Sequence, residues 1–185
     1  KLNIPHLKTP LGTFIKSFAE YNFIPKGMAL KLSLLNNSNL EEFPKNELQN
    51  YSINLKKKIF NLTKTQKDSL KKIEKKSNEF RVHVVQGVTG SGKTIVYFHA
   101  IKKILDKSRQ CLILLPEIGL ISQFEKKFTE FFGFYPAIWH SGISQKNRKI
   151  IWNGVVNNKI KIVIGARSSL FPVSYTHLRA HETQS

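Results

Sequence analysis

The chain has 185 residues, of which 41% are hydrophobic, and a formal net charge of +18. This length suits one domain with a proper core, and no hydrophobic run is long enough to span a membrane. The one cysteine, Cys111, excludes a disulfide framework and any zinc site built from cysteines within the chain. The start of the chain shows no signal-peptide pattern, so we expect a cytoplasmic protein with no membrane partner.

The positive charge has two interpretations. Lys and Arg number 30 against 12 Asp and Glu, and clustered basic side chains bind phosphate backbones by releasing counterions. This favours a nucleic-acid partner. However, lysine greatly outnumbers arginine, and Asn and Ile are also abundant, a pattern typical of an AT-rich genome. The charge alone does not choose between the two.

The first 35 residues predict a short helical segment. Apolar side chains at helical spacing indicate one helix that Pro25 stops, and a second apolar patch follows at 28–35. The simplest interpretation is that these side chains form core. Residues 36–61 are polar and lysine-rich, which predicts a linker. The apolar positions of the helix are Leu11, Phe14, Ile15, Phe18 and Tyr21.

A second helix is predicted to begin near Thr63. Thr63 or Thr65 can cap it, and Leu70 and Ile73 lie on one side together with Gln66. Gln66 also lies shortly before the glycine-rich loop described next. Its amide can pair with both hydrogen-bonding edges of adenine. Gln66 is therefore a candidate for base recognition as well as a helix-face residue.

The next segment is a short apolar run followed by a glycine-rich loop. The run at 82–85 predicts a buried strand, and G-V-T-G-S-G-K-T follows it at 87–94. This spacing is that of the phosphate-binding loop of nucleotide hydrolases. Gly87, Gly90 and Gly92 let the backbone turn, partly at positive φ, so that successive N–H groups converge on the phosphates. The helix that follows adds its unpaired N-terminal donors and its dipole.

Two side chains at the end of this loop have specific expected roles. Lys93 would lie along the phosphates as a compact cation, and the hydroxyl of Thr94 would ligate the Mg²⁺ that bridges them. We therefore predict Lys93 and Thr94 as catalytic residues and Thr94 as the metal ligand. Contacts to the nucleotide are predicted for Gln66, Gly87, Thr89, Gly90, Ser91, Gly92, Lys93 and Thr94.

Beyond the loop, helical segments alternate with apolar runs. This alternation predicts a parallel sheet with helices on both faces. Ligands of such sheets bind beyond the carboxyl ends of the strands. The motifs P-E-I-G, H-S-G and G-A-R-S-S each follow a strand, so we expect them at one rim together with the glycine loop. Helices are predicted over 94–107, up to residue 132 and over 144–157 with Ser144 as cap, and strands over 111–115, 136–139 and 161–164.

The motifs V-T-G-S-G-K-T, L-P-E-I-G-L-I-S-Q, W-H-S-G and I-V-I-G-A-R-S-S-L-F occur in this order. Together they closely resemble the first motor lobe of the PriA (primosomal protein N′) family, the replication-restart helicases of superfamily 2. The resemblance covers about residues 62–172. A weaker one, at 19–34, is to the end of that family's N-terminal DNA-binding domain. The expected fold is therefore α/β, with a truncated RecA-like P-loop domain at 62–173 preceded by a small partial N-terminal segment at 1–35 and a linker at 36–61.

The resemblance implies an ATP-driven helicase that moves 3′ to 5′ along single-stranded DNA and unwinds forked DNA at stalled forks. It also implies primosome proteins and single-strand binding protein as partners, and ATP and Mg²⁺ as cofactors. Carried over by position, Gln66 would contact adenine, and the strand-end motifs would track the DNA backbone without reading bases. For His140 a bond to a neighbouring loop explains the residue equally well, and Glu117 is better explained as a loop organiser than as a catalytic base. The predicted DNA contacts are Ser122, Gln123, His140, Ser141, Arg167, Ser168 and Ser169.

The sequence departs from the family pattern after residue 172. The pattern has an acidic D-E-E-H strand end there, which holds Mg²⁺ and orients water. Here residues 174–185 change in composition and are interpreted as foreign to the gene, since they resemble translated sequencing adapter. The second motor lobe, its arginine fingers and the family's zinc-binding module have no counterpart, so zinc is not expected in this chain. We therefore expect no DNA-stimulated ATP turnover from these residues alone.

Two other functions fit parts of the sequence. A small-molecule phosphotransferase could use the same loop, although the strand-end motifs offer no substrate-specific lid. A passive single-stranded nucleic-acid-binding module with a vestigial loop would share the positive charge. Binding of Mg-ATP separates the passive module from the motor, because only an intact loop gains stability from its ligand.

Overall fold

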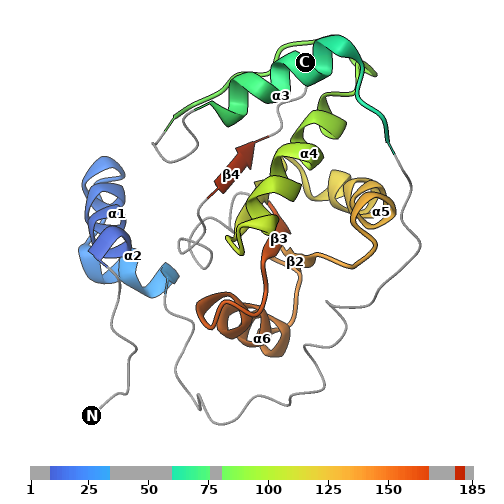
Figure 1. The fold of residues 1–185 in the computed structure, drawn as a ribbon. Helices are drawn as coiled ribbons and strands as arrows, with labels where there is room; N and C mark the ends of the chain where they lie inside the picture. Colours follow the sequence, from blue (N-terminus) through green and yellow to red (C-terminus); the bar gives the residue numbers. More distant parts are fainter. Residues whose placement is uncertain (1–8, 34–59, 76–80, 167–177, 182–185) are drawn as a thin grey trace.

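The computed structural model describes residues 9–33, 60–75, 81–166 and 178–181 (Figure 1). Within these ranges four α-helices come first, and from residue 111 onward strands and helices alternate. The elements are α1 Thr9–Tyr21, α2 Lys26–Ser33, α3 Lys64–Glu74, α4 Lys93–Asp106, β1 Cys111–Leu114, the 3-10 helix η2 Ile118–Leu120, α5 Ile121–Phe132, β2 Ala137–Trp139, α6 Gln145–Val156, β3 Ile162–Gly165 and β4 Leu178–His181.

The strands form one parallel sheet in the order β2-β3-β1-β4. β1 lies between β3 and β4, with Leu114 opposite Gly165 on one side and opposite His181 on the other. β2 pairs with the far side of β3 and places Trp139 opposite Gly165. The carboxyl ends of the strands are therefore in register at one rim of the sheet.

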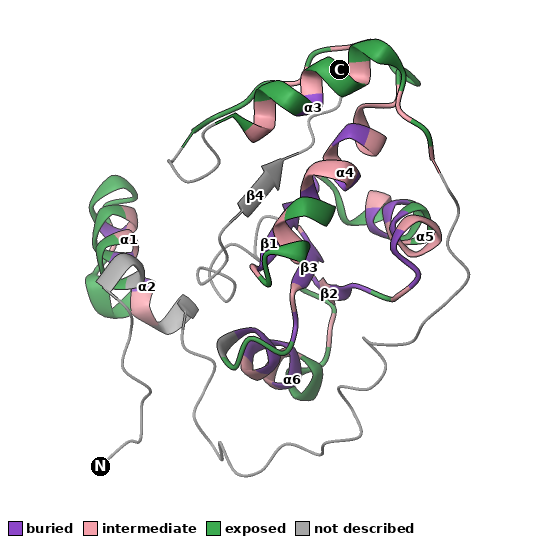
Figure 2. Ribbon diagram, in the orientation of Figure 1, coloured by how far each residue is buried: buried purple, intermediate pink, exposed green. Residues whose placement is uncertain are grey.

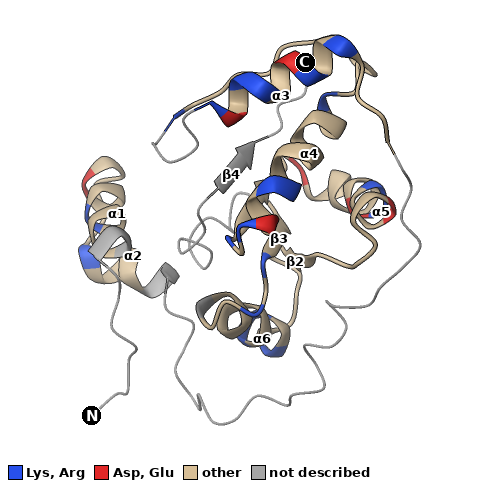
Figure 3. Ribbon diagram, viewed as in Figure 1, with Lys and Arg blue, Asp and Glu red and all other residues tan. Residues whose placement is uncertain are grey.

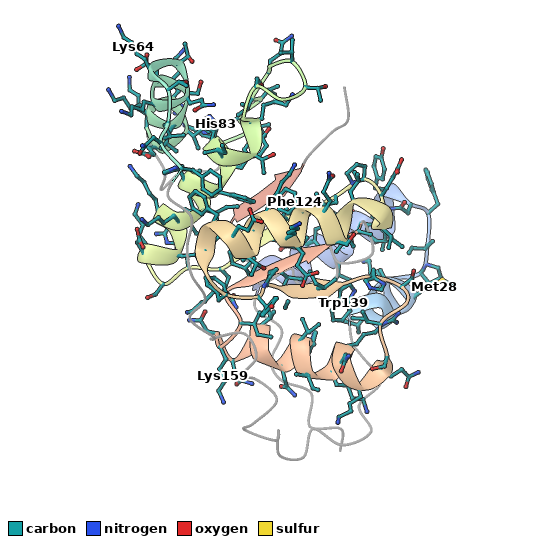
Figure 4. All side chains as sticks on the ribbon, turned by 90° about the vertical axis from the view of Figure 1, so that its right-hand side faces the viewer. Met28, Lys64, His83, Phe124, Trp139 and Lys159 are labelled. Atoms are coloured by element: carbon teal, nitrogen blue, oxygen red, sulfur yellow. The ribbon has the colours of Figure 1, made fainter. Side chains whose placement is uncertain are left out.

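Helices cover both faces of this sheet, because successive side chains of a strand point to opposite faces. Ile113 of β1 packs with α4 and α5, whereas Leu112 of the same strand packs with α6. Figure 4 views the layers from the side, with Phe124 of α5 and Trp139 of β2 on opposite sides of the sheet. Buried residues gather on the strands and on the helix sides that face them (Figure 2). The predicted α/β architecture is confirmed.

Phenylalanine fills most of the core between α4 and α5. Phe98 of α4 is 2% exposed, and its ring lies 5.4–5.8 Å, between centroids, from the rings of Phe124, Phe128 and Phe132 on α5. Those three residues recur at every fourth position and so share one face of α5. Their edge-to-face contacts add to the stabilisation that burial provides. This core holds α4 in place, and with it the loop that leads into α4.

The helix boundaries follow the predicted capping residues. Thr63 caps α3, and Ser144 caps α6 by accepting a hydrogen bond from the Asn147 N–H at 3.2 Å. α5 ends at Gly133, whose φ of 77° is left-handed, as is common after a helix.

No helix in the described ranges is long and apolar enough to cross a membrane.

The helix expected before residue 25 is present as α1, and it packs against α2. Ile15, Ala19 and Ala29 are buried between the two helices. The expectation that all the apolar side chains here form core was wrong, because Tyr21 and Met28 are 85% and 60% exposed. Two short helices share a single contact face, so apolar residues on their outer sides stay in water.

The strand predicted at 82–85 is not formed. Residues 81–88 lie outside any strand, and Val82 and Val84 are 78% and 87% exposed. An apolar run becomes a strand only where a neighbouring edge offers hydrogen-bond partners. The edge of β1 that β3 leaves open is paired with β4 instead. β4 falls within the segment interpreted as foreign, and that interpretation stays a prediction.

Cys111 offers a direct test of how well β1 is buried. The side chain is 0% exposed, and burial raises the pKa of its thiol to about 12. Because the thiolate is the reactive form, we expect the folded chain to resist Ellman's reagent at pH 8 and to react in step with unfolding. Labelling and circular dichroism followed across a urea series check this, and fast labelling without urea would contradict it.

Candidate nucleotide site and strand-end loops

The glycine-rich loop has the backbone conformation that its sequence predicts. Gly90 and Gly92 have φ of 80° and 82°, in the left-handed region that glycine adopts without steric cost. The Ser91 N–H donates to the Val88 carbonyl at 3.1 Å and closes the turn. A side chain at Gly90 would meet nothing within 4 Å, so the loop faces open space there. The predicted positive φ is confirmed at two of the three glycines.

The loop leads directly into α4. Gly92 is the residue before the first helical turn and makes no side-chain cap. The Ile95 and Val96 N–H groups turn back to the Gly92 carbonyl at 3.0 and 3.4 Å. A helix start without a capping side chain presents backbone donors and the positive end of the dipole. This is the arrangement that binds phosphate at helix N-termini.

Lys93 is the first residue of α4 and folds back over the loop. Its Nζ donates to the Gly87 carbonyl and, at 3.3 Å, to the Val88 carbonyl. The ammonium group is therefore held beside the turn that the glycines make. Thr94 follows in the same helical turn and is half-buried. Thr89 and Ser91 are exposed on the loop.

Gln66 joins α3 to this loop. Its Oε1 accepts from the Thr63 N–H at 2.9 Å while its own N–H donates to Thr63 Oγ1 at 3.3 Å, which is a complete capping box. Its Nε2 donates to the Ser91 carbonyl at 3.0 Å. The predicted adenine contact stays a prediction, but the structure already uses both ends of this amide within the protein.

Besides the contact of Gln66 with the loop, a buried side chain and an ion pair hold α3 against α4. Leu70 is buried on α3, and Lys103 of α4 forms an ion pair with Glu74 of α3 at 2.5 Å. The loop therefore lies where two packed helices meet.

Basic side chains occur on α1, α3, α4, α5 and α6 and are not confined to one element (Figure 3).

α4 places the loop toward the carboxyl ends of the strands. A short connection joins α4 to β1, and α4 packs on the sheet through Phe98 and Ile101. In an α/β unit such a helix returns antiparallel to the strands, which places its N-terminal end toward the strand-end rim. After β1, Glu117 and Gly119 are exposed, as are Ser122 and Gln123 at the start of α5. The P-E-I-G motif thus leads into a helix start near the rim.

The H-S-G motif follows β2 at the same rim. The Gly142 N–H donates to Nδ1 of His140 at 3.1 Å, so this ring nitrogen is bonded within the H-S-G turn itself. Because Nδ1 accepts this bond, the proton of the neutral ring belongs on Nε2. The bond to a neighbouring loop and the DNA contact that the sequence suggests for His140 both stay predictions. Ser141 is exposed. Arg167, Ser168 and Ser169 lie outside the described residues.

Arg148 of α6 contacts this loop, and the sequence did not predict that contact. Its Nη2 donates to the Ser141 carbonyl from the first half of α6. The contact joins Ser141, before the Ser144 cap, to Arg148, after it. A basic residue soon after a capping serine is the sequence feature that could have predicted this contact. In the described ranges, no three His, Cys, Asp or Glu side chains gather as a metal site.

Comparison with known proteins identifies the family. The family model described as Type III restriction enzyme, res subunit (ResIII), matches residues 59–184. The replication restart protein PriA of Rickettsia conorii is 52% identical over 88 residues, which are 48% of this chain and 14% of that protein. PriA of Bacillus subtilis is 39% identical over 95 residues, 51% of this chain and 12% of the relative. PriA of Helicobacter pylori is 37% identical over 110 residues, 60% of this chain and 17% of the relative.

The chain thus spans less than a fifth of the length of these PriA relatives. Among solved structures, the UvsW helicase of bacteriophage T4 aligns with 87% of this chain and 55% of its own, at 17% identity and a TM-score of 0.46. The ResIII match alone covers more than half of the chain. The chain therefore belongs to the ResIII family and, over about half its length, is similar to the replication restart proteins PriA.

Proposed function

We propose that this chain is part of an ATP-dependent DNA helicase that moves 3′ to 5′ along single-stranded DNA and acts in replication restart at stalled forks. The observation that carries the proposal is the loop at 87–94. Left-handed Gly90 and Gly92 shape it, and Lys93 opens a helix that has no side-chain cap. Such helix starts bind phosphate.

The loop residues have defined roles in this proposal. The Lys93 ammonium donates hydrogen bonds to the Gly87 and Val88 carbonyls. A triphosphate would replace these neutral acceptors with charged oxygens, which bind an ammonium more strongly. Thr94 would ligate Mg²⁺ through its hydroxyl. Thr89 and Ser91 would line the same loop. Bound Mg-ATP supplies the hydrolysable phosphoanhydride bond, and the chain's residues bind and orient it.

The strand-end loops would hold the DNA. Ser122, Gln123 and Ser141 are exposed near the carboxyl rim, and His140 has Nε2 left to meet a ligand because the loop occupies Nδ1. Hydroxyl, amide and imidazole groups of this kind bind phosphate oxygens and do not read bases. We include Arg167, Ser168 and Ser169 in the proposed DNA contacts on the basis of their sequence motif.

The proposed partners follow from the proposed activity. Single-stranded and forked DNA would be the substrates, and the net charge of +18 favours such polyanions. We also propose primosome proteins and single-strand binding protein as partners, and the cytoplasm as the location, because the sequence motifs at 87–171 resemble those of the PriA family. A passive nucleic-acid-binding module is the alternative, and it would bind DNA without binding Mg-ATP.

Single-stranded DNA binding tests the role of the rim. We expect Ser141→Ala to weaken binding of a fluorescent oligonucleotide by about tenfold, because a hydrogen bond to a charged phosphate is lost. The loss should be the same for oligonucleotides of different base sequence. Ser108→Ala is the matched control, since Ser108 lies at the opposite end of β1 and is also exposed. Equal effects of the two substitutions would contradict the assignment of DNA to this rim.

A further inference from the structure

Gln66 donates a hydrogen bond to the glycine-rich loop at the Ser91 carbonyl. The bond from Nε2 measures 3.0 Å, and it joins residues that are 25 positions apart in the sequence. Ser91 lies between Gly90 and Gly92, the two left-handed residues of the loop. The contact therefore holds the backbone at the centre of the turn, between the two glycines.

The direction of that carbonyl determines the direction of the next N–H group. In a trans peptide the C=O and the following N–H point to opposite sides, and the structure has no cis peptide bond in the described residues. When Gln66 holds the Ser91 carbonyl toward α3, the Gly92 N–H must point away from α3. Gly92, which flanks this peptide and lacks a side chain, lets it rotate easily, so an external bond is needed to fix it.

The space around Gly92 supports the same role. A Cβ built on Gly92 would lie 2.5 Å from Gln66 Nε2, so the amide occupies the position that a side chain would take. The capping box holds the other end of the amide, because Gln66 Oε1 accepts from the Thr63 N–H. Gln66 is therefore fixed at one end to the start of α3 and at the other to the loop.

We propose that Gln66 is a positioning residue that orients the Gly92 N–H toward bound phosphate, so that it controls affinity for any triphosphate, whatever its base. The inference rests on the proposed function, because it requires the loop to bind a triphosphate. It assigns Gln66 to the phosphates through the loop. Adenine recognition by the same side chain is the outcome that the experiment separates from it.

The test compares two variants of the chain. Gln66→Met keeps the length of the side chain and adds no charge, but it loses the Ser91 bond and one arm of the capping box. Thr63→Ala loses the other arm of the capping box and leaves the Ser91 bond in place. Any difference in ligand binding between the two variants therefore belongs to the Ser91 contact.

Affinity is measured for Mg-ATP, Mg-GTP and inorganic tripolyphosphate. We expect Gln66→Met to weaken all three by the same factor, about tenfold, and Thr63→Ala to lower the melting temperature without changing the three affinities. The Gly92 amide resonance should shift when tripolyphosphate is added to the wild-type chain and should lose this shift in Gln66→Met.

Failure of this inference can be told apart from failure of the proposed function. A loss confined to Mg-ATP would show that Gln66 reads adenine, and unchanged affinities for all three ligands would show that the Ser91 contact does not matter; either result overturns the inference while wild-type binding stands. If the wild-type chain binds none of the three ligands, the proposed function fails, and the inference fails with it.

Discussion

Gly92→Ala is expected to weaken triphosphate binding by about tenfold or more, since left-handed backbone costs a residue with a Cβ about 1–2 kcal/mol. Gly92 has a φ of 82°, and its new Cβ would lie 2.5 Å from Gln66 Nε2. Gln66 can swing away, but it then releases the Ser91 carbonyl that it holds. The substitution therefore adds strain and also frees the loop. Isothermal titration with tripolyphosphate and Mg²⁺ measures the effect.

Gly90→Ala is the matched control for this substitution. Gly90 has a φ of 80°, almost the same as Gly92, but its Cβ would meet nothing within 4 Å. It carries the strain of the left-handed backbone without the contact to Gln66. We expect it to weaken binding less than Gly92→Ala does. The reverse order would show that the contact between α3 and the loop is unimportant.

Phe128→Ala is expected to destabilise the chain by about 3–5 kcal/mol, the range for deleting a buried phenylalanine. Phe128 is 0% exposed and contacts the rings of Phe98 and Phe132. Removing it leaves a cavity between α4 and α5, where the surrounding rings cannot fully close. Because domains are stable by only about 5–15 kcal/mol, this loss is a large fraction of the total. Urea unfolding followed by circular dichroism measures it.

Tyr135→Ala serves as the control for the core. Tyr135 is an aromatic residue near the end of α5 and is 43% exposed. Its truncation should cost much less than that of Phe128, because much of its surface is already in water. Similar unfolding midpoints for the two variants would mean that the phenylalanine cluster is not the core that holds α4.

The sequence predicted the local structure well because the signals for it are local. Thr63 or Thr65 was expected to cap α3 and Ser144 to cap α6, and Thr63 and Ser144 are the caps, since a cap depends on residues within one turn. The positive φ at Gly90 and Gly92 was also expected, because the loop spacing requires it. The three strands β1, β2 and β3 follow apolar runs that are buried between two helical layers.

The features that the sequence could not predict depend on contacts between residues that are far apart in the sequence. The run at 82–85 resembles a buried strand, but whether it pairs depends on which segment occupies the edge of β1. The contact between Gln66 and Ser91 joins a helix and a loop that only the packing of α3 on α4 brings together. Tyr21 was assigned to a core by its helical spacing and Met28 by its place in an apolar patch, and neither signal shows whether another element covers that side.

The proposed function requires the loop at 87–94 to bind a triphosphate through Lys93. Thermal unfolding of the chain with and without Mg-ATP tests this, in parallel with Lys93→Ala. We expect saturating Mg-ATP, at about 100 times its dissociation constant, to raise the melting temperature of the wild-type chain by about 5–10 °C and to leave the variant unchanged. No rise in the wild-type chain, or an equal rise in Lys93→Ala, would contradict the claim.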